Sequence, residues 1–86
     1  MDAALKSAIE VAAARLRREF PKIGACRADV DGIGDGAPRF SARLDLRLPE
    51  CQILVSGKPA PSIEAALEAA FAEARERLLR RARLAA

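Results

Sequence analysis

The sequence predicts an α+β fold in which two helices cover one face of a three-stranded antiparallel sheet. Two long segments, one toward each end of the chain, repeat apolar residues at three- and four-residue steps, which is typical of amphipathic helices. Between them, apolar and charged residues alternate over short runs separated by Gly- and Pro-containing turns, which is typical of half-buried strands joined as hairpins. Because a sheet with one apolar face needs a cover, the expected architecture is a two-layer sandwich of order αβββα.

The first helix is expected over about Asp2 to Phe20. Alanine fills most positions outside the apolar stripe, which favours a helix. Asp2 is the expected N-cap, and Pro21 is the expected stop because the residue before a proline is disfavoured in the helical conformation. The stripe consists of Leu5, Ile9, Ala12, Leu16 and Phe20. With this stripe turned toward the sheet, Arg18 points away from it.

Three strands are expected over about Ala25 to Asp31, Arg39 to Leu48 and Cys51 to Ser56. In the second of these, apolar residues alternate with polar ones, so one side is buried and the other faces water. Residues 31–38 are rich in glycine and are expected to form a hairpin loop. They do not form a phosphate-binding loop, because neither a Gly-Lys-Ser/Thr motif nor a helix follows. Pro49–Glu50 is expected to turn the second strand tightly into the third, which completes an antiparallel meander.

The second helix is expected over about Ile63 to Ala82, with Ser62 as its N-cap. Its glutamates come early and most of its arginines come late, an order that suits the helix dipole. The dipole does not account for the whole arginine cluster, since Arg80 and Arg83 point away from the apolar stripe.

The composition argues against an enzyme. The chain has 86 residues, enough for a single domain spanning 1–86, and it contains no His, the commonest general base and a frequent metal ligand. No serine therefore has a His partner, and Glu73 and Glu76 lie among arginines, where surface ion pairs are expected rather than a catalytic pair of carboxylates. We expect no catalytic residues, no metal and no other cofactor.

Two cysteines, Cys26 and Cys51, stand in phase with apolar neighbours and are expected to be small core residues with free thiols. Secretory signal and membrane-spanning patterns are both absent from the sequence. The expected location is the reducing environment of the cytoplasm.

The formal net charge is only +3, but its distribution along the chain is uneven. Basic residues gather near the end of each expected helix, over residues 15–22 and 75–83, whereas charges in the strands are nearly balanced. Arginine favours phosphate through its planar fork of donors, and a segregated basic surface is typical of nucleic-acid binding. From charge alone, this interpretation and a merely solvated face have equal weight.

Four segments, residues 15–23, 26–30, 40–49 and 65–78, carry a resemblance that spans most of the chain. The chain resembles the ribosome hibernation-promoting factor family, also described as ribosome-associated translation inhibitors or ribosomal subunit interface proteins. The resemblance lies in the order and spacing of these segments rather than in one motif. The family fold is βαβββα, so this chain resembles a short form that begins on the helix, without the family's first strand.

The resemblance implies a protein that binds the small ribosomal subunit in the mRNA and tRNA channel and regulates translation, for example in a stress response. Basic residues of the two helices would contact rRNA phosphates, which carry affinity and salt dependence but little sequence readout. By matching position, the implied rRNA-binding residues are Arg15, Arg18, Lys22, Arg75, Arg77, Arg80, Arg81 and Arg83.

The missing first strand would leave the strand over Ala25–Asp31 as an open sheet edge. Such an edge could pair with a second copy, so a homodimer through Ala25–Asp31 is a further expectation. The alternative function is accordingly a protein-interaction module, or a degenerate paralogue, without ribosome binding. The double-stranded RNA-binding domain shares the order αβββα but needs a His-containing loop that this chain lacks.

Overall fold

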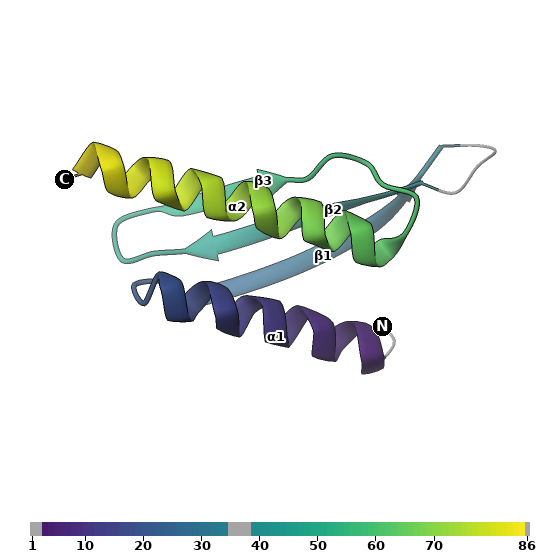
Figure 1. The fold of residues 1–86 in the computed structure, drawn as a ribbon, viewed down its shortest axis with the longest axis horizontal. Coiled ribbons are helices and arrows are strands. Elements are labelled where there is room, and N and C mark those ends of the chain that lie inside the picture. Colours follow the sequence, from purple (N-terminus) through teal and green to yellow (C-terminus); the bar gives the residue numbers. More distant parts are fainter. Residues whose placement is uncertain (1–2, 35–38, 86) are drawn as a thin grey trace.

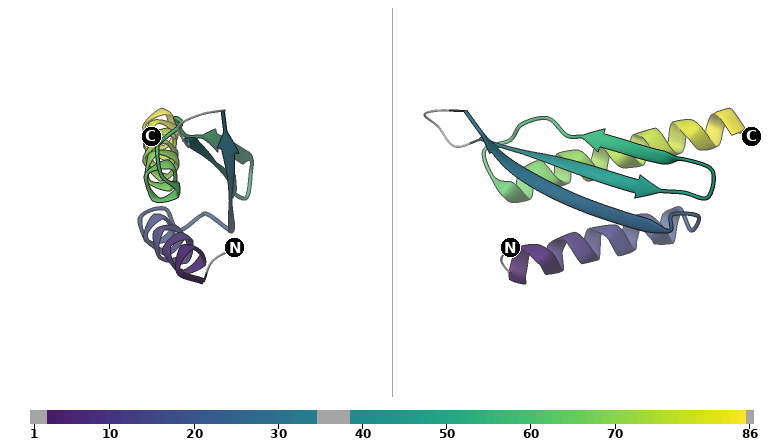
Figure 2. Two further views of the ribbon diagram at one scale, coloured as in Figure 1. Left: turned by 90° about the vertical axis from the view of Figure 1, so that its right-hand side faces the viewer. Right: turned by 180° about the vertical axis from the view of Figure 1, so that it is seen from behind.

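The computed structural model describes residues 3–34 and 39–85 and confirms the predicted αβββα order (Figure 1). The three strands form one antiparallel sheet of order β1-β2-β3. Both helices lie on the same face of this sheet, as the end-on view in Figure 2 shows, so the molecule is the predicted two-layer sandwich. The elements are α1 (Ala3–Glu19), β1 (Ala25–Ile33), β2 (Arg39–Arg47), β3 (Gln52–Ser56) and α2 (Ile63–Ala85).

The core lies between the sheet and α2. Leu44 and Leu46 of β2 and Val55 of β3 are the largest fully buried side chains, and all three come from the apolar side of the predicted alternation. Facing them, α2 presents a row of fully buried alanines at helical spacing, Ala66, Ala70 and Ala74. Small side chains on this face let the helix axis come close to the sheet. From α1, Ala13 and Leu16 are buried, while most of the remaining predicted stripe is half-buried.

Gly57 directly follows β3 and packs closely against the backbone of α2 at Ala70. Its N–H donates to the carbonyl oxygen of Ala42 at 3.0 Å, which extends the β2–β3 ladder by one residue. A Cβ at this position would stand 2.7 Å from the backbone nitrogen of Ala70, so only glycine fits. Beyond Gly57, the backbone N–H of Phe40 donates to the carbonyl oxygen of Ala60, and the N–H of Ala60 donates to that of Phe40, both at 2.8 Å. These two bonds hold the segment between β3 and α2 against the start of β2.

Several predicted boundaries are corrected by the structure. The first strand extends two residues beyond Asp31, because Gly32 and Ile33 still pair with β2 across the ladder instead of entering the loop. The second and third strands are each one residue shorter than expected at their shared turn, and α1 ends one residue before Phe20. The second helix continues past Ala82 to Ala85, since no helix breaker follows. Of the rest of the predicted loop, Gly34 is described and has a positive φ of 84°, and residues 35–38 lie outside the described residues.

Of the two predicted N-caps, Ser62 and Asp2, the structure describes only Ser62. Ser62 caps α2 as predicted, because its hydroxyl oxygen accepts a hydrogen bond from the backbone N–H of Ala65 at 3.1 Å. The predicted cap of the first helix, Asp2, lies outside the described residues.

The face of the sheet away from the helices carries the charged half of the alternation. Arg43 pairs diagonally with Asp31 across the strands at 2.9 Å, and the amide of Gln52 donates to Asp45 at 2.9 Å. Leu54 and Ile33 are the exceptions on this face, with 64% and 40% of their surface exposed. Such exposed cross-strand pairs each contribute a fraction of a kcal/mol, so this face is a solvated surface rather than a second core.

β1 lies at an edge of the described sheet, as the sequence predicts. Two backbone hydrogen bonds show which residues of β2 bond toward β3. The N–H of Leu48 donates to the carbonyl oxygen of Cys51 (2.8 Å), and the carbonyl oxygen of Ala42 accepts from the N–H of Gly57. The even-numbered positions therefore face β3. The ladder alternates, so odd-numbered residues of β2 bond toward β1. Through the register, the backbone groups that β1 turns away from β2 belong to Cys26, Ala28, Val30 and Gly32.

Cys26 and Cys51 carry free thiols and are half-buried, which corrects the expectation that both are enclosed in the core. Cys26 belongs to the edge strand and Cys51 to the β2–β3 turn, where the apolar cover is incomplete. Partial burial raises the pKa of the Cys26 thiol, an effect that nearby Arg17 opposes and Asp45 reinforces.

Candidate nucleic-acid interface

The two basic helix ends meet at one end of the molecule. Figure 1 shows that α1 and α2 run in the same direction across the sheet, so their C-termini lie at the same end, beside the β2–β3 turn. The C-terminal part of α2 projects beyond the sheet. The basic residues of 15–22 and 75–83 are therefore neighbours in space, although they are far apart in the sequence. We call this region the basic end.

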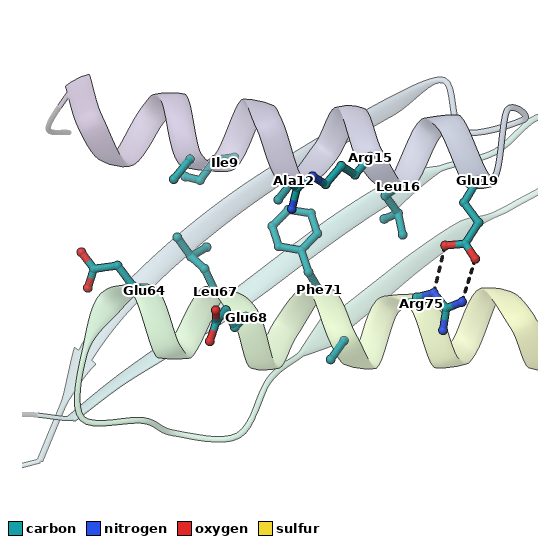
Figure 3. Close-up of a pocket in the computed structure, with 12 residues that line it drawn as sticks. Ile9, Ala12, Arg15, Leu16, Glu19, Glu64, Leu67, Glu68, Phe71 and Arg75 are labelled. Atoms are coloured by element: carbon teal, nitrogen blue, oxygen red, sulfur yellow. Dashed lines mark hydrogen bonds and ion pairs between the residues drawn. The ribbon is translucent and has the colours of Figure 1, made fainter.

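A bidentate ion pair joins the two helices at the basic end. Nε and Nη2 of Arg75 donate to the two carboxylate oxygens of Glu19 at 2.9 and 2.8 Å (Figure 3). These hydrogen bonds hold the pKa of Glu19 below its usual value and raise that of Arg75. Both side chains are substantially exposed, at 40% and 51%, so solvent screens the pair and its main effect is to orient the helix ends.

Replacing Glu19 with glutamine should remove a pH-dependent part of the stability. Because folding lowers the pKa of Glu19, its contribution is present above about pH 4.5, the ordinary value, and is lost as the pH falls through the folded-state pKa. Urea unfolding of the wild type and Glu19→Gln should therefore differ at pH 7 and converge in acid. A difference that stays constant down to about pH 2, well below the ordinary pKa of a glutamate, would contradict this account.

Two further arginines of the predicted set are held by carboxylates. Arg81 donates to Glu50, in the β2–β3 turn, at 2.8 Å. Arg77 lies 3.5 Å from Glu73 one helical turn away, and its Nη1 donates to the carbonyl oxygen of Leu54 at 3.0 Å. That second bond uses an outward-facing carbonyl of β3, so Arg77 also covers part of this sheet edge.

The other members of the predicted set make no ion pair with a carboxylate within the described residues, and all of them are exposed. Their guanidinium and ammonium groups are therefore available to a ligand without first giving up a partner. They are Arg15, Arg18, Lys22, Arg80 and Arg83.

A cavity of about 1030 Å³ opens at the basic end, beneath the overhanging part of α2. Its basic lining comes from Lys22, Arg77, Arg80 and Arg81, and its apolar lining includes Leu78. Arg15 and Arg75 instead line a separate groove between the two helices. Arg18 and Arg83 line neither hollow, so the predicted set is spread over the two hollows and the exposed surface outside them.

The ion pair of Glu73 with Arg77 agrees with the expectation from the sequence, but Glu19 and Glu50 were not anticipated as partners of arginines. Glu19 lies 56 residues from Arg75, and Glu50 lies 31 residues from Arg81, so no local pattern connects them. A topological signal does exist for Glu50. In a meander that starts at the end of the first helix, the turn between the second and third strands returns to that same end.

The described part of the chain contains neither a cluster of metal ligands nor a membrane-spanning helix. No group of three or more His, Cys, Asp or Glu residues there could hold a metal ion. Neither described helix combines the length and apolar content needed to cross a lipid bilayer.

Comparison with known proteins adds no family assignment, because no family model, curated protein or solved structure matches the chain.

Proposed function

We propose that this protein binds the small ribosomal subunit through rRNA phosphates and thereby inhibits translation or promotes ribosome hibernation. The observation that supports this most is the convergence of two basic helix ends into one exposed basic end. A protein with this partner works in the cytoplasm. The ribosomal partner itself comes from the family resemblance of the sequence, whereas the position of the contact surface comes from the fold.

The five unpaired basic residues of the basic end are the primary phosphate contacts in this proposal. Arg80 and Arg83 are both exposed and belong to the C-terminal part of α2, which extends beyond the sheet in Figure 1 and leaves room for a bulky RNA. Arg75, Arg77 and Arg81 must first release or share their carboxylate partners, so their contribution to affinity is smaller. The interface thus reads charge and shape rather than base sequence.

Co-sedimentation with purified ribosomal subunits over a salt series tests the proposal. Five phosphate contacts predict that the logarithm of the association constant falls with the logarithm of salt concentration with a slope of about −4. Binding should favour the small subunit over the large one. No association at low salt, or association that salt leaves unchanged, would overturn the proposal.

A protein-interaction module is the second candidate, and one observation favours it. The β1 edge, where four residues turn their backbone groups away from β2, can accept an extended strand from another chain. Under this alternative the protein does not sediment with either subunit at low salt.

A further inference from the structure

The cavity of about 1030 Å³ at the basic end has an apolar lining as well as a basic one. Its larger apolar side chains come from the segment after α1, from the region of β2 and β3, and from α2: Phe20, Leu48, Ile53, Leu78 and Leu84. Phe20, Leu48 and Ile53 are only half-buried, and Leu84 leaves 83% of its surface exposed. The described chain therefore leaves apolar surface of this cavity, including part of an aromatic side chain, uncovered.

The charged groups that line the cavity leave an excess of cations. Three carboxylates line it, and each is already paired with an arginine: Glu19 with Arg75, Glu50 with Arg81 and Glu73 with Arg77. Lys22 and Arg80 also line it, and neither makes an ion pair within the described residues. A ligand that matches this lining combines negative charge with a flat or apolar part.

We propose that the cavity holds a single-stranded nucleotide of the RNA whose phosphates the basic end contacts, with its base against the apolar lining. The identification of the ligand as RNA rests on the proposed function. A nucleotide has the required chemistry, because its base is a flat ring and its phosphates are anionic. Phe20 supplies an aromatic ring for stacking, and Lys22 and Arg80 supply cations for the phosphates.

The strandedness of the RNA follows from this arrangement. A base that is stacked and paired inside a duplex cannot enter a cavity, so the site selects single strands, loops or bulges. Cavities that bind small molecules typically measure about 300–1,000 Å³, and this one lies at the upper end of that range. Stacking accepts any base, so the site adds affinity without reading the base sequence.

The surroundings of the cavity favour RNA over an acidic peptide as its ligand. Exposed cations continue outside the cavity at Arg18 and Arg83, and neither is paired with a carboxylate in the described structure. A nucleic-acid backbone carries a phosphate at every residue and can follow such a surface, whereas a peptide would need an acid opposite each cation.

Fluorescence anisotropy with labelled RNA tests the site on the purified full chain. One probe is a single strand without self-complementarity, and the other is a hairpin with the same number of phosphates. The wild type should bind the single strand at least about fivefold more tightly, although a duplex has the higher charge density.

Two substitutions separate the base contact from the phosphate contacts. Phe20→Leu keeps an apolar side chain but removes the ring, and it should weaken single-strand binding at least about fivefold. Leu84→Ser changes a side chain that is too exposed to affect folding, and it should weaken single-strand binding as well. Both should leave hairpin binding and the salt dependence unchanged. Leu54→Ser alters an exposed leucine on the other face of the sheet and is the matched control that should bind as the wild type does.

Circular dichroism and thermal unfolding establish that each variant is folded. The base site is overturned if the wild type does not prefer the single strand, or if Phe20→Leu and Leu84→Ser both bind the single strand as the wild type does. An acidic, leucine-rich peptide that binds more tightly than single-stranded RNA also overturns it. Salt-dependent binding to the small subunit would still support the proposed function in each of these cases. Conversely, a preference for single strands without binding to either subunit supports the base site and overturns the proposed function.

Discussion

Replacing Arg80 and Arg83 together with glutamate should weaken binding to the small ribosomal subunit by at least about 100-fold at near-physiological salt. Each substitution removes a charge-assisted contact worth about 1.5–3 kcal/mol and adds a carboxylate that repels phosphate. Neither arginine has a carboxylate partner in the described structure, so the loss falls on binding rather than on an internal ion pair. Co-sedimentation across salt concentrations should also show a slope at least about two units shallower.

A substitution that makes the basic end more positive, instead of less, serves as the matched control. Glu50→Gln releases Arg81 from its 2.8 Å ion pair and raises the local charge by one, so binding should tighten and its salt dependence should steepen. Both variants change exposed side chains and should keep the helical circular dichroism signal of the wild type. If Arg80→Glu/Arg83→Glu binds as well as the wild type, the basic end is not the contact surface.

Replacing Gly57 with alanine should cause the largest loss of stability among single conservative substitutions. The added methyl group would meet the backbone nitrogen and Cα of Ala70 at 2.7 and 2.9 Å, and backbone atoms cannot turn aside as a flexible side chain can. Either α2 moves away from the sheet or the β2–β3 ladder loses its last bond. We expect a loss of about 3 kcal/mol, which for a domain of this size lowers the melting temperature by about 12–24 °C.

The same exchange at Gly32 separates the steric effect from the general effect of losing a glycine. No atom lies within 4 Å of a Cβ at that position, and its φ is not positive, so Gly32→Ala should be neutral or slightly stabilising. Thermal unfolding followed by circular dichroism measures both variants. Equal melting temperatures for Gly57→Ala and the wild type would contradict the close approach to α2.

The elements that could be predicted are those whose signal is local. The alternation of β2, the hydroxyl cap at Ser62 and the proline after α1 each depend on residues within a few positions of one another. The errors are confined to element ends. Gly32 and Ile33 are strand residues because Phe40 and Arg39 pair with them across the ladder, and this partnership overrides the turn preference of the glycine.

The sequence identifies the basic residues of the candidate site, but it does not show which of them are paired with carboxylates. An excess of arginine at two places in the sequence identifies basic helix ends, and periodicity shows that Arg18, Arg80 and Arg83 point away from the core. Which arginines are neutralised depends on acids brought from elsewhere. The Glu19–Arg75 pair exists because the helices run in the same direction, and the Glu50–Arg81 pair exists because a strand turn lies beneath α2.

Short-range physical chemistry was thus sufficient for the element order, the apolar faces and the chemical type of the candidate surface. Side-chain periodicity and caps act over one or two turns of chain and need no knowledge of the rest. Two features arose only when the chain packed: the single basic end, and the pairing of Arg75 and Arg81 with acids remote in sequence. Each depends on distances between residues remote in sequence, which the packing of the helices on one face of the sheet sets.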